Sequence, residues 1–159
     1  MVAASARGYD AAVTRPPRPL SAEEIDALLT ADVPARLATL DRQGFPHVTP
    51  LWFIWDGGAF YLTSFPDRPH VRRLERDPRA GICVDVEEPE RDNGERPNQQ
   101  VRAVGTAKLF TDDGGLWTRR ITRKYVTGAR ADERAEQRAA QPRTVIRLAP
   151  ARLVAVASV

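Results

Sequence analysis

The chain has 159 residues, of which 42% are hydrophobic, enough to build one domain around a single continuous core. Its net charge of +3 comes from 24 basic and 21 acidic residues that alternate in most segments, so nucleic acid is not the expected partner. One cysteine, two histidines and the lack of an apolar run of about 18 residues exclude an internal disulfide, a zinc motif and a membrane span, so we expect a soluble, cytoplasmic protein without a structural metal.

The first 20 residues are predicted to form a flexible N-terminal arm, because they contain three prolines and no apolar period. The predicted domain, residues 21–159, begins where Ser21 and Glu24 form a capping-box pattern. Apolar residues follow this pattern at helical spacing. A first helix is therefore expected over residues 21–31.

Three antiparallel strands are expected next, because the hydrophobic period changes to two from Ala35 onward. The turn-forming segments Asp41-Arg42-Gln43-Gly44 and Asp56-Gly57-Gly58 separate them. The predicted strands cover residues 35–40, 47–55 and 59–64. In the second strand successive side chains point to opposite faces, so we expect one of its faces to belong to the core.

A helix and two more strands follow in the predicted order. Asp67 is expected to cap the helix, which has Pro69 at its first position and ends at Pro78. A fourth strand is expected around residues 82–87, before a polar loop over residues 88–99. The fifth strand is then predicted over residues 100–110.

The last part of the chain is predicted to hold two helices and a sixth strand. Trp117, Ile121 and Tyr125 are spaced by four, which indicates the packed face of a helix that stops at Gly128. A short helix over residues 131–140 and a β segment over residues 144–156, with a break at Pro150, complete the pattern.

The order of these elements favours a mainly β fold with some α structure. Six mostly consecutive antiparallel strands, with helices after the third and the fifth, indicate a small closed or split barrel more than a parallel α/β sheet. The sequence has no glycine-rich loop between strand and helix, no Ser or Cys nucleophile elbow and no cluster of metal ligands. A nucleotide site on a glycine-rich loop, a nucleophilic Ser or Cys site and a metal site are therefore not expected.

Several motifs at spaced positions carry a family resemblance. They are Arg36-Leu37-Ala38-Thr39-Leu40, Gly44-Phe45-Pro46-His47-Val48-Thr49-Pro50-Leu51-Trp52-Phe53, Tyr61-Leu62-Thr63-Ser64, Arg68-Pro69-His70-Val71-Arg72-Arg73-Leu74, Asp77-Pro78-Arg79-Ala80 and Val104-Gly105-Thr106-Ala107. Together these motifs, over residues 21–156, resemble the pyridoxamine 5′-phosphate oxidase-like family of flavin- and deazaflavin (F420)-dependent oxidoreductases. The resemblance implies a six-stranded antiparallel split β-barrel, the FMN-binding split barrel, with peripheral helices.

The resemblance also implies a homodimer that binds FMN, or alternatively F420, in clefts at the subunit interface. The cofactor phosphate is expected at the end of the third strand and in the first turn of the next helix, where backbone N–H groups and the helix dipole favour an anion. The residues implied there are Leu62, Thr63, Ser64, Arg68, His70 and Arg72. Many relatives have a lysine in place of His70.

The cofactor ring is expected beside the second strand. The resemblance places Thr49, Pro50, Leu51 and Trp52 there, with Trp52 as a wall of the pocket. It also places Gln99 and Gln100 where the other subunit contacts the cofactor. No side chain stands out as a catalytic proton donor.

Three functions remain open at this point. The first is an oxidoreductase that moves a hydride between FMN or F420 and a small, conjugated organic substrate. The second is a non-catalytic carrier or sensor that binds flavin or haem. The third is a barrel that has lost its cofactor and serves as an interaction module, because the fold alone does not define function.

Overall fold

The computed structural model describes residues 17–91, 94 and 96–158. The elements follow the chain in the order β1 (Arg18–Pro19), α1 (Ala22–Thr30), β2 (Ala35–Leu40), β3 (Pro46–Leu51), β4 (Phe53–Asp56), β5 (Ala59–Ser64), α2 (Pro69–Arg76), β6 (Arg79–Glu87), β7 (Asn98–Thr111), a 3-10 turn (Asp113–Gly115), α3 (Leu116–Tyr125), α4 (Ala131–Ala139) and β8 (Thr144–Ser158).

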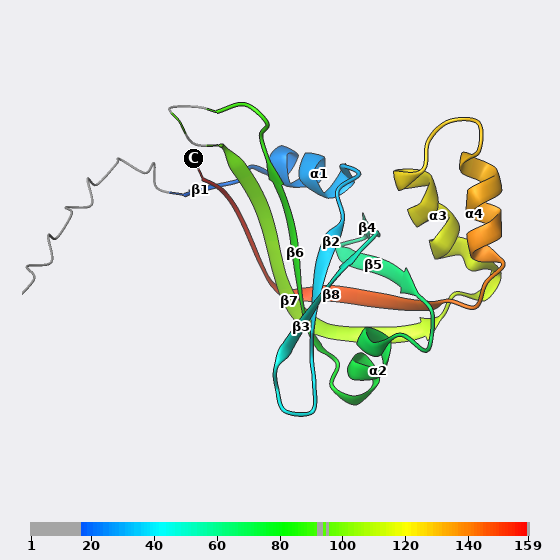
Figure 1. Ribbon diagram of the computed structural model, residues 1–159. Helices are drawn as coiled ribbons and strands as arrows, with labels where there is room; N and C mark the ends of the chain where they lie inside the picture. Colours follow the sequence, from blue (N-terminus) through cyan, green and yellow to red (C-terminus); the bar gives the residue numbers. More distant parts are fainter. Residues whose placement is uncertain (1–16, 92–93, 95, 159) are drawn as a thin grey trace, which may run out of the picture.

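All described strands belong to one antiparallel sheet in the order β3-β2-β6-β7-β8-β5-β4, and β1 pairs with β8. The end strands β3 and β4 are consecutive in the chain, with only Trp52 between them, so the sheet curls until its two ends meet (Figure 1). Helices lie at its ends and flanks. The mainly β split barrel with peripheral helices is therefore confirmed.

The described chain has eight strands instead of the predicted six, because β1 was not predicted and because the second predicted strand, residues 47–55, is two strands. Its first half, β3, pairs with β2, and its second half, β4, pairs with β5. The expectation that one face of the whole segment is core holds only for β4, where Phe53 is fully buried. Every residue of β3 is at least partly exposed. The chain thus changes its pairing partner at Trp52, and the sequence shows no turn signal there.

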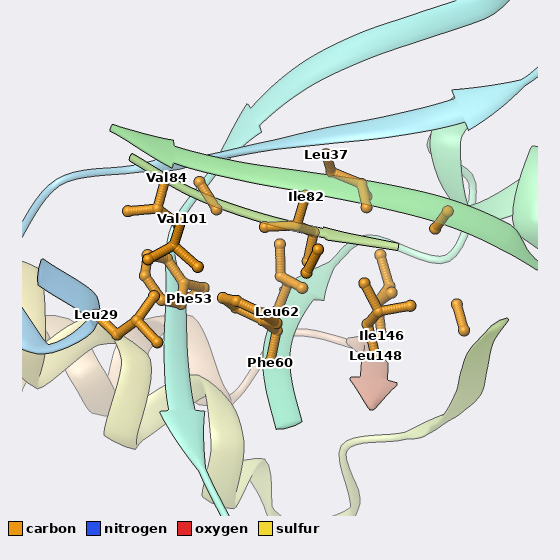
Figure 2. Close-up of a cluster of buried hydrophobic side chains, with 14 of the residues drawn as sticks. Leu29, Leu37, Phe53, Phe60, Leu62, Ile82, Val84, Val101, Ile146 and Leu148 are labelled. Atoms are coloured by element: carbon orange, nitrogen blue, oxygen red, sulfur yellow. The ribbon is translucent and has the colours of Figure 1, made fainter. Parts of the chain in front are cut away.

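The core fills the inside of the curled sheet (Figure 2). Phe53 of β4 and Phe60 of β5 are both fully buried, with ring centroids 5.6 Å apart, and α1 contributes Leu28 and Leu29. Burial of one such side chain stabilises the fold by about 1.5–3 kcal/mol. The strands that border the site described below are therefore fixed by a packed interior.

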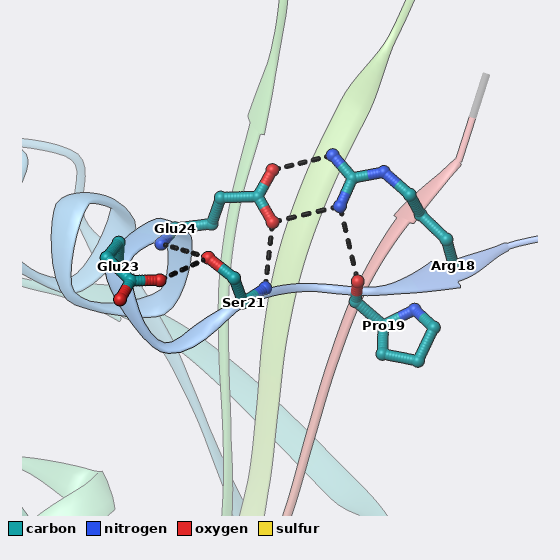
Figure 3. A network of polar contacts seen from close by, with 5 residues as sticks. All are labelled: Arg18, Pro19, Ser21, Glu23 and Glu24. Carbon is teal, nitrogen blue, oxygen red and sulfur yellow. Dashed lines mark hydrogen bonds and ion pairs between the residues drawn. The ribbon is translucent and has the colours of Figure 1, made fainter.

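The first helix begins as predicted. The Ser21 hydroxyl accepts a hydrogen bond from the Glu24 backbone N–H at 3.2 Å, and the Ser21 N–H donates to the Glu24 carboxylate at 2.8 Å. Arg18 binds the same carboxylate through two of its nitrogens (Figure 3).

The predicted N-terminal arm needs one correction and is otherwise outside the described residues. Residues 1–16 are not described by the structure. Arg18 and Pro19, however, form β1 against the C-terminal end of β8, and Leu20 is only 7% exposed and belongs to the core. The structured part of the chain therefore begins before residue 21, because Leu20 has an apolar site to fill.

Several further boundaries differ from their predictions. β6 begins at Arg79 instead of residue 82, and β7 covers Asn98–Thr111 instead of residues 100–110. The N-cap of α2 is Arg68 rather than Asp67, with Pro69 at the first helical position, and α3 ends at Tyr125, before Gly128. The short helix predicted over residues 131–140 is present as α4, Ala131–Ala139.

The final strand does not break at Pro150. β8 runs through it, and the pairing with β7 shifts there, because Val104 lies opposite Arg152 and Gly105 lies opposite Pro150. A proline has no backbone N–H to donate to a neighbouring strand. A strand therefore tolerates a proline at a point where its pairing is irregular, such as this shift. Gly105 allows the close approach, since a Cβ at this position would lie 2.7 Å from the Ala149 carbonyl oxygen.

Candidate cofactor-binding site

A pocket of about 590 Å³ opens where β5 ends and α2 begins. One wall comes from β3, which contributes His47 and Thr49, and another comes from Thr63 and Ser64 of β5. The first turns of α2 and the segment from α4 to β8 complete the lining. The pocket thus lies where the strand-to-helix turn brings backbone and side-chain donors together.

The α2 side of the pocket carries positive charge. Arg68, the N-cap of α2, and Arg73 both line it. The N-terminal end of a helix carries a partial positive charge and unpaired N–H groups, so this end favours an anion. Among the residues that the structure describes, four arginines and two histidines line the pocket and no carboxylate does.

Ser64 and His70 are held together at the base of this turn. Both are buried, and the Ser64 hydroxyl shares a hydrogen bond with His70 Nε2 at 2.7 Å. Burial lowers the pKa of His70, and the charges of Arg68 and Arg73 lower it further. The imidazole is therefore neutral at pH 7 and positions the Ser64 hydroxyl instead of adding a fixed charge.

Two lining arginines come from a distant part of the chain and were not among the predicted site residues. Arg138 is in the last turn of α4, and Arg143 directly precedes β8. Arg143 is only 9% exposed, and its guanidinium carbon lies 3.8 Å from the centroid of the Phe65 ring. The Nε atoms of both arginines are buried and have no hydrogen-bond partner within the described chain.

No local sequence signal distinguishes these two arginines, because α4 is rich in charged residues throughout. His47 is a further lining residue that the sequence did not single out; its Nε2 lies 2.9 Å from the Asp41 carboxylate. Only the pairing of β8 with β5, which sets Thr144 opposite Ser64, brings Arg143 beside the pocket.

A second pocket of about 380 Å³ adjoins the first, and the two share Leu51, Thr63 and Arg138 in their linings. Pro50 and Trp52 line this second pocket. The Trp52 ring stacks on Tyr125 at 4.8 Å between centroids, and the Arg138 guanidinium carbon lies 4.8 Å from the Trp52 ring centroid. The Trp52 ring thus contacts both an aromatic ring and a cation.

Eight of the twelve predicted site residues line these two adjoining pockets. They are Thr49, Pro50, Leu51, Trp52, Thr63, Ser64, Arg68 and His70.

The other four predicted residues lie elsewhere in this chain. The Leu62 side chain is fully buried in the core, and Arg72 is exposed on α2 outside both linings. Gln99 and Gln100 lie on β7, where Gln100 lines a separate pocket of about 320 Å³ with Asp85 and Cys83. Their role toward a cofactor held by another subunit stays a prediction.

The residues of the larger pocket fit a phosphorylated cofactor. A phosphate needs several donors and opposite charge, and the pocket offers guanidinium groups, hydroxyls and a helix N-terminus. The buried Nε atoms of Arg138 and Arg143 lack a protein acceptor among the described residues, so an anion would supply one.

The fold defines a split-barrel protein, and comparison with known families agrees. The sequence model of the pyridoxamine 5′-phosphate oxidase family matches residues 21–157. The chain therefore belongs to the pyridoxamine 5′-phosphate oxidase family. A search of curated proteins finds no significant match.

Several solved structures share the fold. A FAD-binding protein from Mesorhizobium loti is 22% identical, with a TM-score of 0.62, and the match covers 91% of this chain and 98% of that one. The haem storage protein HutZ from Vibrio cholerae is 24% identical, with a TM-score of 0.64 and coverage of 84% and 94%. A protein described as an F420 reductase is 22% identical, with a TM-score of 0.57 and coverage of 80% and 94%. At these identities the likeness establishes the fold alone.

Within the described residues, no helix combines the length and apolar character that crossing a membrane requires. Among the same residues, no group of three or more His, Cys, Asp or Glu side chains is arranged to hold a metal ion.

Proposed function

We propose that this protein is an oxidoreductase that binds FMN, or alternatively F420, and serves hydride transfer to or from a small, conjugated organic substrate. The observation that carries the proposal is the pocket at the start of α2. Arginines and hydroxyls line it, no described carboxylate does, and it shares Leu51, Thr63 and Arg138 with the pocket at Trp52. Family membership supports it.

Different residues of the chain bind the phosphate and the ring of the cofactor. Arg68 and the first turn of α2 hold the phosphate, and His70 orients the Ser64 hydroxyl toward it. The backbone of β3 and the Trp52 side chain border the space for the ring. The bound flavin or deazaflavin supplies the hydride chemistry, for which the protein provides binding and orientation.

The proposed assembly is a homodimer with the cofactor at its interface. Val48, Ala38, Gly81 and Val104 form a row across four neighbouring strands, because they are register partners. Val48 is 62% exposed and Val104 is 45% exposed, so this row leaves apolar surface on the outside of the sheet. Such a patch is a usual mark of a protein interface.

The outer face of the sheet also carries one of the predicted contact residues. Gln100 lies on the same face of β7 as Val104, since side chains alternate along a strand, and the intervening Val101 and Ala103 point into the core. A second copy packed on this face would therefore contact Gln100.

Purified protein tests the proposal directly. Visible absorbance and fluorescence would identify FMN, F420 or haem, and titration of the cofactor-free protein with FMN and F420 would give affinities. Light scattering is expected to give twice the 17.7 kDa of one chain. Failure to bind either cofactor, or a monomer at micromolar concentration, would contradict the proposal.

A carrier role is the second candidate, since a haem storage protein and a FAD-binding protein share the fold. A carrier would bind its cofactor but show no turnover. A cofactor that is reduced and re-oxidised by added donors and conjugated acceptors, at a rate above that of the free cofactor, would favour the enzyme. A Soret band in the purified protein would favour haem.

A further inference from the structure

Trp52 lies at the point where the sheet changes its pairing partner. It is the single residue between β3 and β4, so its backbone belongs to neither strand. Its side chain nevertheless lines the pocket of about 380 Å³, where the cofactor ring is proposed to bind. Keeping a side chain in one orientation costs conformational entropy, so a pocket wall at this position needs a contact that holds it.

Tyr125, the last residue of α3, supplies such a contact. Its ring lies parallel to the Trp52 ring, with 4.8 Å between centroids and 3° between planes. Tyr125 lies outside both pocket linings, whereas Ile121, one turn earlier on the same face of α3, lines the pocket with Trp52. Tyr125 therefore contacts the wall of the pocket and not the space inside it.

The Tyr125 hydroxyl fixes its ring to the backbone at two points. It donates to the Val33 carbonyl at 2.9 Å and accepts a hydrogen bond from the Phe53 N–H at 3.2 Å. Burial raises the pKa of Tyr125 to about 12, so the hydroxyl keeps the proton that it donates. Val33 precedes Pro34, a residue of the same pocket lining, and Phe53 follows Trp52. One phenol thus holds the backbone beside two lining residues and stacks on one of them.

We propose that Tyr125 is a positioning residue, which holds the Trp52 ring in the orientation that borders the cofactor ring. The inference rests on the proposed function, because that function places the flavin or deazaflavin ring beside Trp52. The spacing of Tyr125 on α3 indicates only a packed helix face, and its stack and its two backbone hydrogen bonds carry this further role. Its effect on the cofactor passes through Trp52.

Three variants separate the ring of Tyr125 from its hydroxyl and from Trp52. Tyr125→Leu removes the stack and both hydrogen bonds, Tyr125→Phe removes only the hydrogen bonds, and Trp52→Ala removes the wall. Tyr61→Leu is the matched control, since the Tyr61 ring stacks on Trp117 at 3.7 Å and its hydroxyl accepts from Arg147 at 3.0 Å. Tyr61 and its two partners lie outside both pocket linings.

Titration of cofactor-free protein with FMN and with F420 measures the affinities. Tyr125→Leu should weaken the complex that the wild type forms by about 3- to 10-fold, because the Trp52 side chain must then be ordered during binding. Tyr125→Phe should restore the affinity to within about twofold of the wild type, since it keeps the stack. Tyr61→Leu should leave the affinity unchanged.

Two further measurements separate positioning from support of the fold. In the Trp52→Ala background, Tyr125→Leu should add no further loss of affinity, whereas a residue that only supports the fold would weaken binding equally with and without Trp52. In cofactor-free protein, the near-ultraviolet circular dichroism that Trp52→Ala removes should also be lost in Tyr125→Leu and persist in Tyr125→Phe.

Other results would overturn the inference. An equal loss from Tyr125→Leu in both backgrounds would assign Tyr125 to the fold, and an unchanged dichroism would show that the Trp52 ring does not depend on the stack. If Tyr125→Leu does not fold, Tyr125→Met replaces it in the same comparison. If the wild type binds neither cofactor, the proposed function fails and the inference with it; if Trp52→Ala weakens binding and Tyr125→Leu does not, only the inference fails.

Discussion

The arginines on the outer faces of α3 and α4 and the arginines of the larger pocket occupy contrasting environments. Arg119 and Arg123 of α3 form ion pairs with Glu136 and Asp132 of α4 at 2.7 and 2.9 Å. Arg138, on the same α4 helix, forms no ion pair with any described carboxylate, and neither does Arg143. The helix pair α3 and α4 therefore carries both arginines that form ion pairs and an arginine that forms none.

This difference separates charges that serve folding and solubility from charges available to a ligand. Exposed ion pairs contribute little to stability, because water screens them and the long side chains lose entropy. A buried guanidinium without an acceptor opposes folding in the free protein. Proteins retain groups of the second kind mainly at functional sites, so the unpaired set marks the candidate site more clearly than net charge does.

The largest effect is expected at Arg68. Loss of one charge-assisted hydrogen bond, about 1.5–3 kcal/mol, should weaken binding of FMN or F420 to Arg68→Ala by about 10- to 150-fold. Arg68→Glu should weaken binding further, because its carboxylate repels the phosphate. The same carboxylate competes with the phosphate for the positive end of the α2 dipole. Titration of cofactor-free protein, followed by ring fluorescence, measures both variants.

Arg91→Ala is the control for this pair of variants. Arg91 is exposed in the polar loop before β7 and donates only to the Gly94 carbonyl among the contacts described. The affinity of Arg91→Ala for FMN or F420 should equal that of the wild type. Equal affinities for the wild type and both Arg68 variants would place the phosphate elsewhere and remove the contrast between paired and unpaired arginines.

Sequence reasoning found the arginine and hydroxyls of the site that are close together in the chain. Ser64, Arg68 and His70 lie within seven residues, where a strand end and a helix start give a local signal for anion binding. Arg143 is about 75 residues further on, and only the β5–β8 pairing brings it to the same pocket. Long-range strand pairing has no local signature, so this half of the pocket could not be predicted.

The fold shows the same division between local and long-range information. Hydrophobic period, the Ser21 capping box and the glycine turns predict most elements, since each acts over a few residues. The change of partner at Trp52 is imposed by closure of the sheet, and the sequence there continues as an unbroken β pattern. The barrel class was therefore predictable and the strand count was not.

The second prediction concerns a buried cation that does have partners. Lys124 donates to the Leu29 carbonyl at 2.9 Å, and its Nζ lies 3.8 Å from the Phe53 ring centroid. Burial lowers the pKa of Lys124 from 10.5 to about 8, although Asp32 opposes the shift. Above pH 8 the folded state loses this proton while the unfolded chain keeps it, so stability should rise with pH toward about 10.

Ionisation of Tyr125 should end this rise in stability with pH. Burial raises the pKa of Tyr125 from 10.0 to about 12, so above pH 10 the unfolded chain releases a proton that the folded state keeps, and stability should fall. Urea unfolding between about pH 7 and pH 11 measures the curve. Lys124→Met should remove the rise, which is on the order of 3 kcal/mol, and exposed Lys108→Met should leave it intact. A flat curve for the wild type would show that the partners of Lys124 fully offset its burial.

The third prediction compares two neighbours near the N-terminal strand. Leu20 belongs to the core, so Leu20→Ala should reduce the free energy of unfolding by about 2 kcal/mol. Arg18 pairs with Glu24 on the surface, and Arg18→Ala should produce no loss that urea unfolding resolves. If Arg18→Ala is the more damaging variant, ion pairing rather than apolar burial holds β1 in place.

The smallest effect is expected at the paired arginines of α3. Arg123 is about half exposed and its partner Asp132 is more exposed still, so water screens their attraction and their side chains lose entropy when they pair. Arg123→Ala should therefore shift the melting temperature by no more than about 2 °C and leave cofactor affinity unchanged. Thermal unfolding and the same fluorescence titration measure both quantities. An affinity loss near that of Arg68→Ala would mean that the positive field of α3 reaches the pocket, and the absence of a carboxylate partner would then no longer identify the ligand-binding arginines.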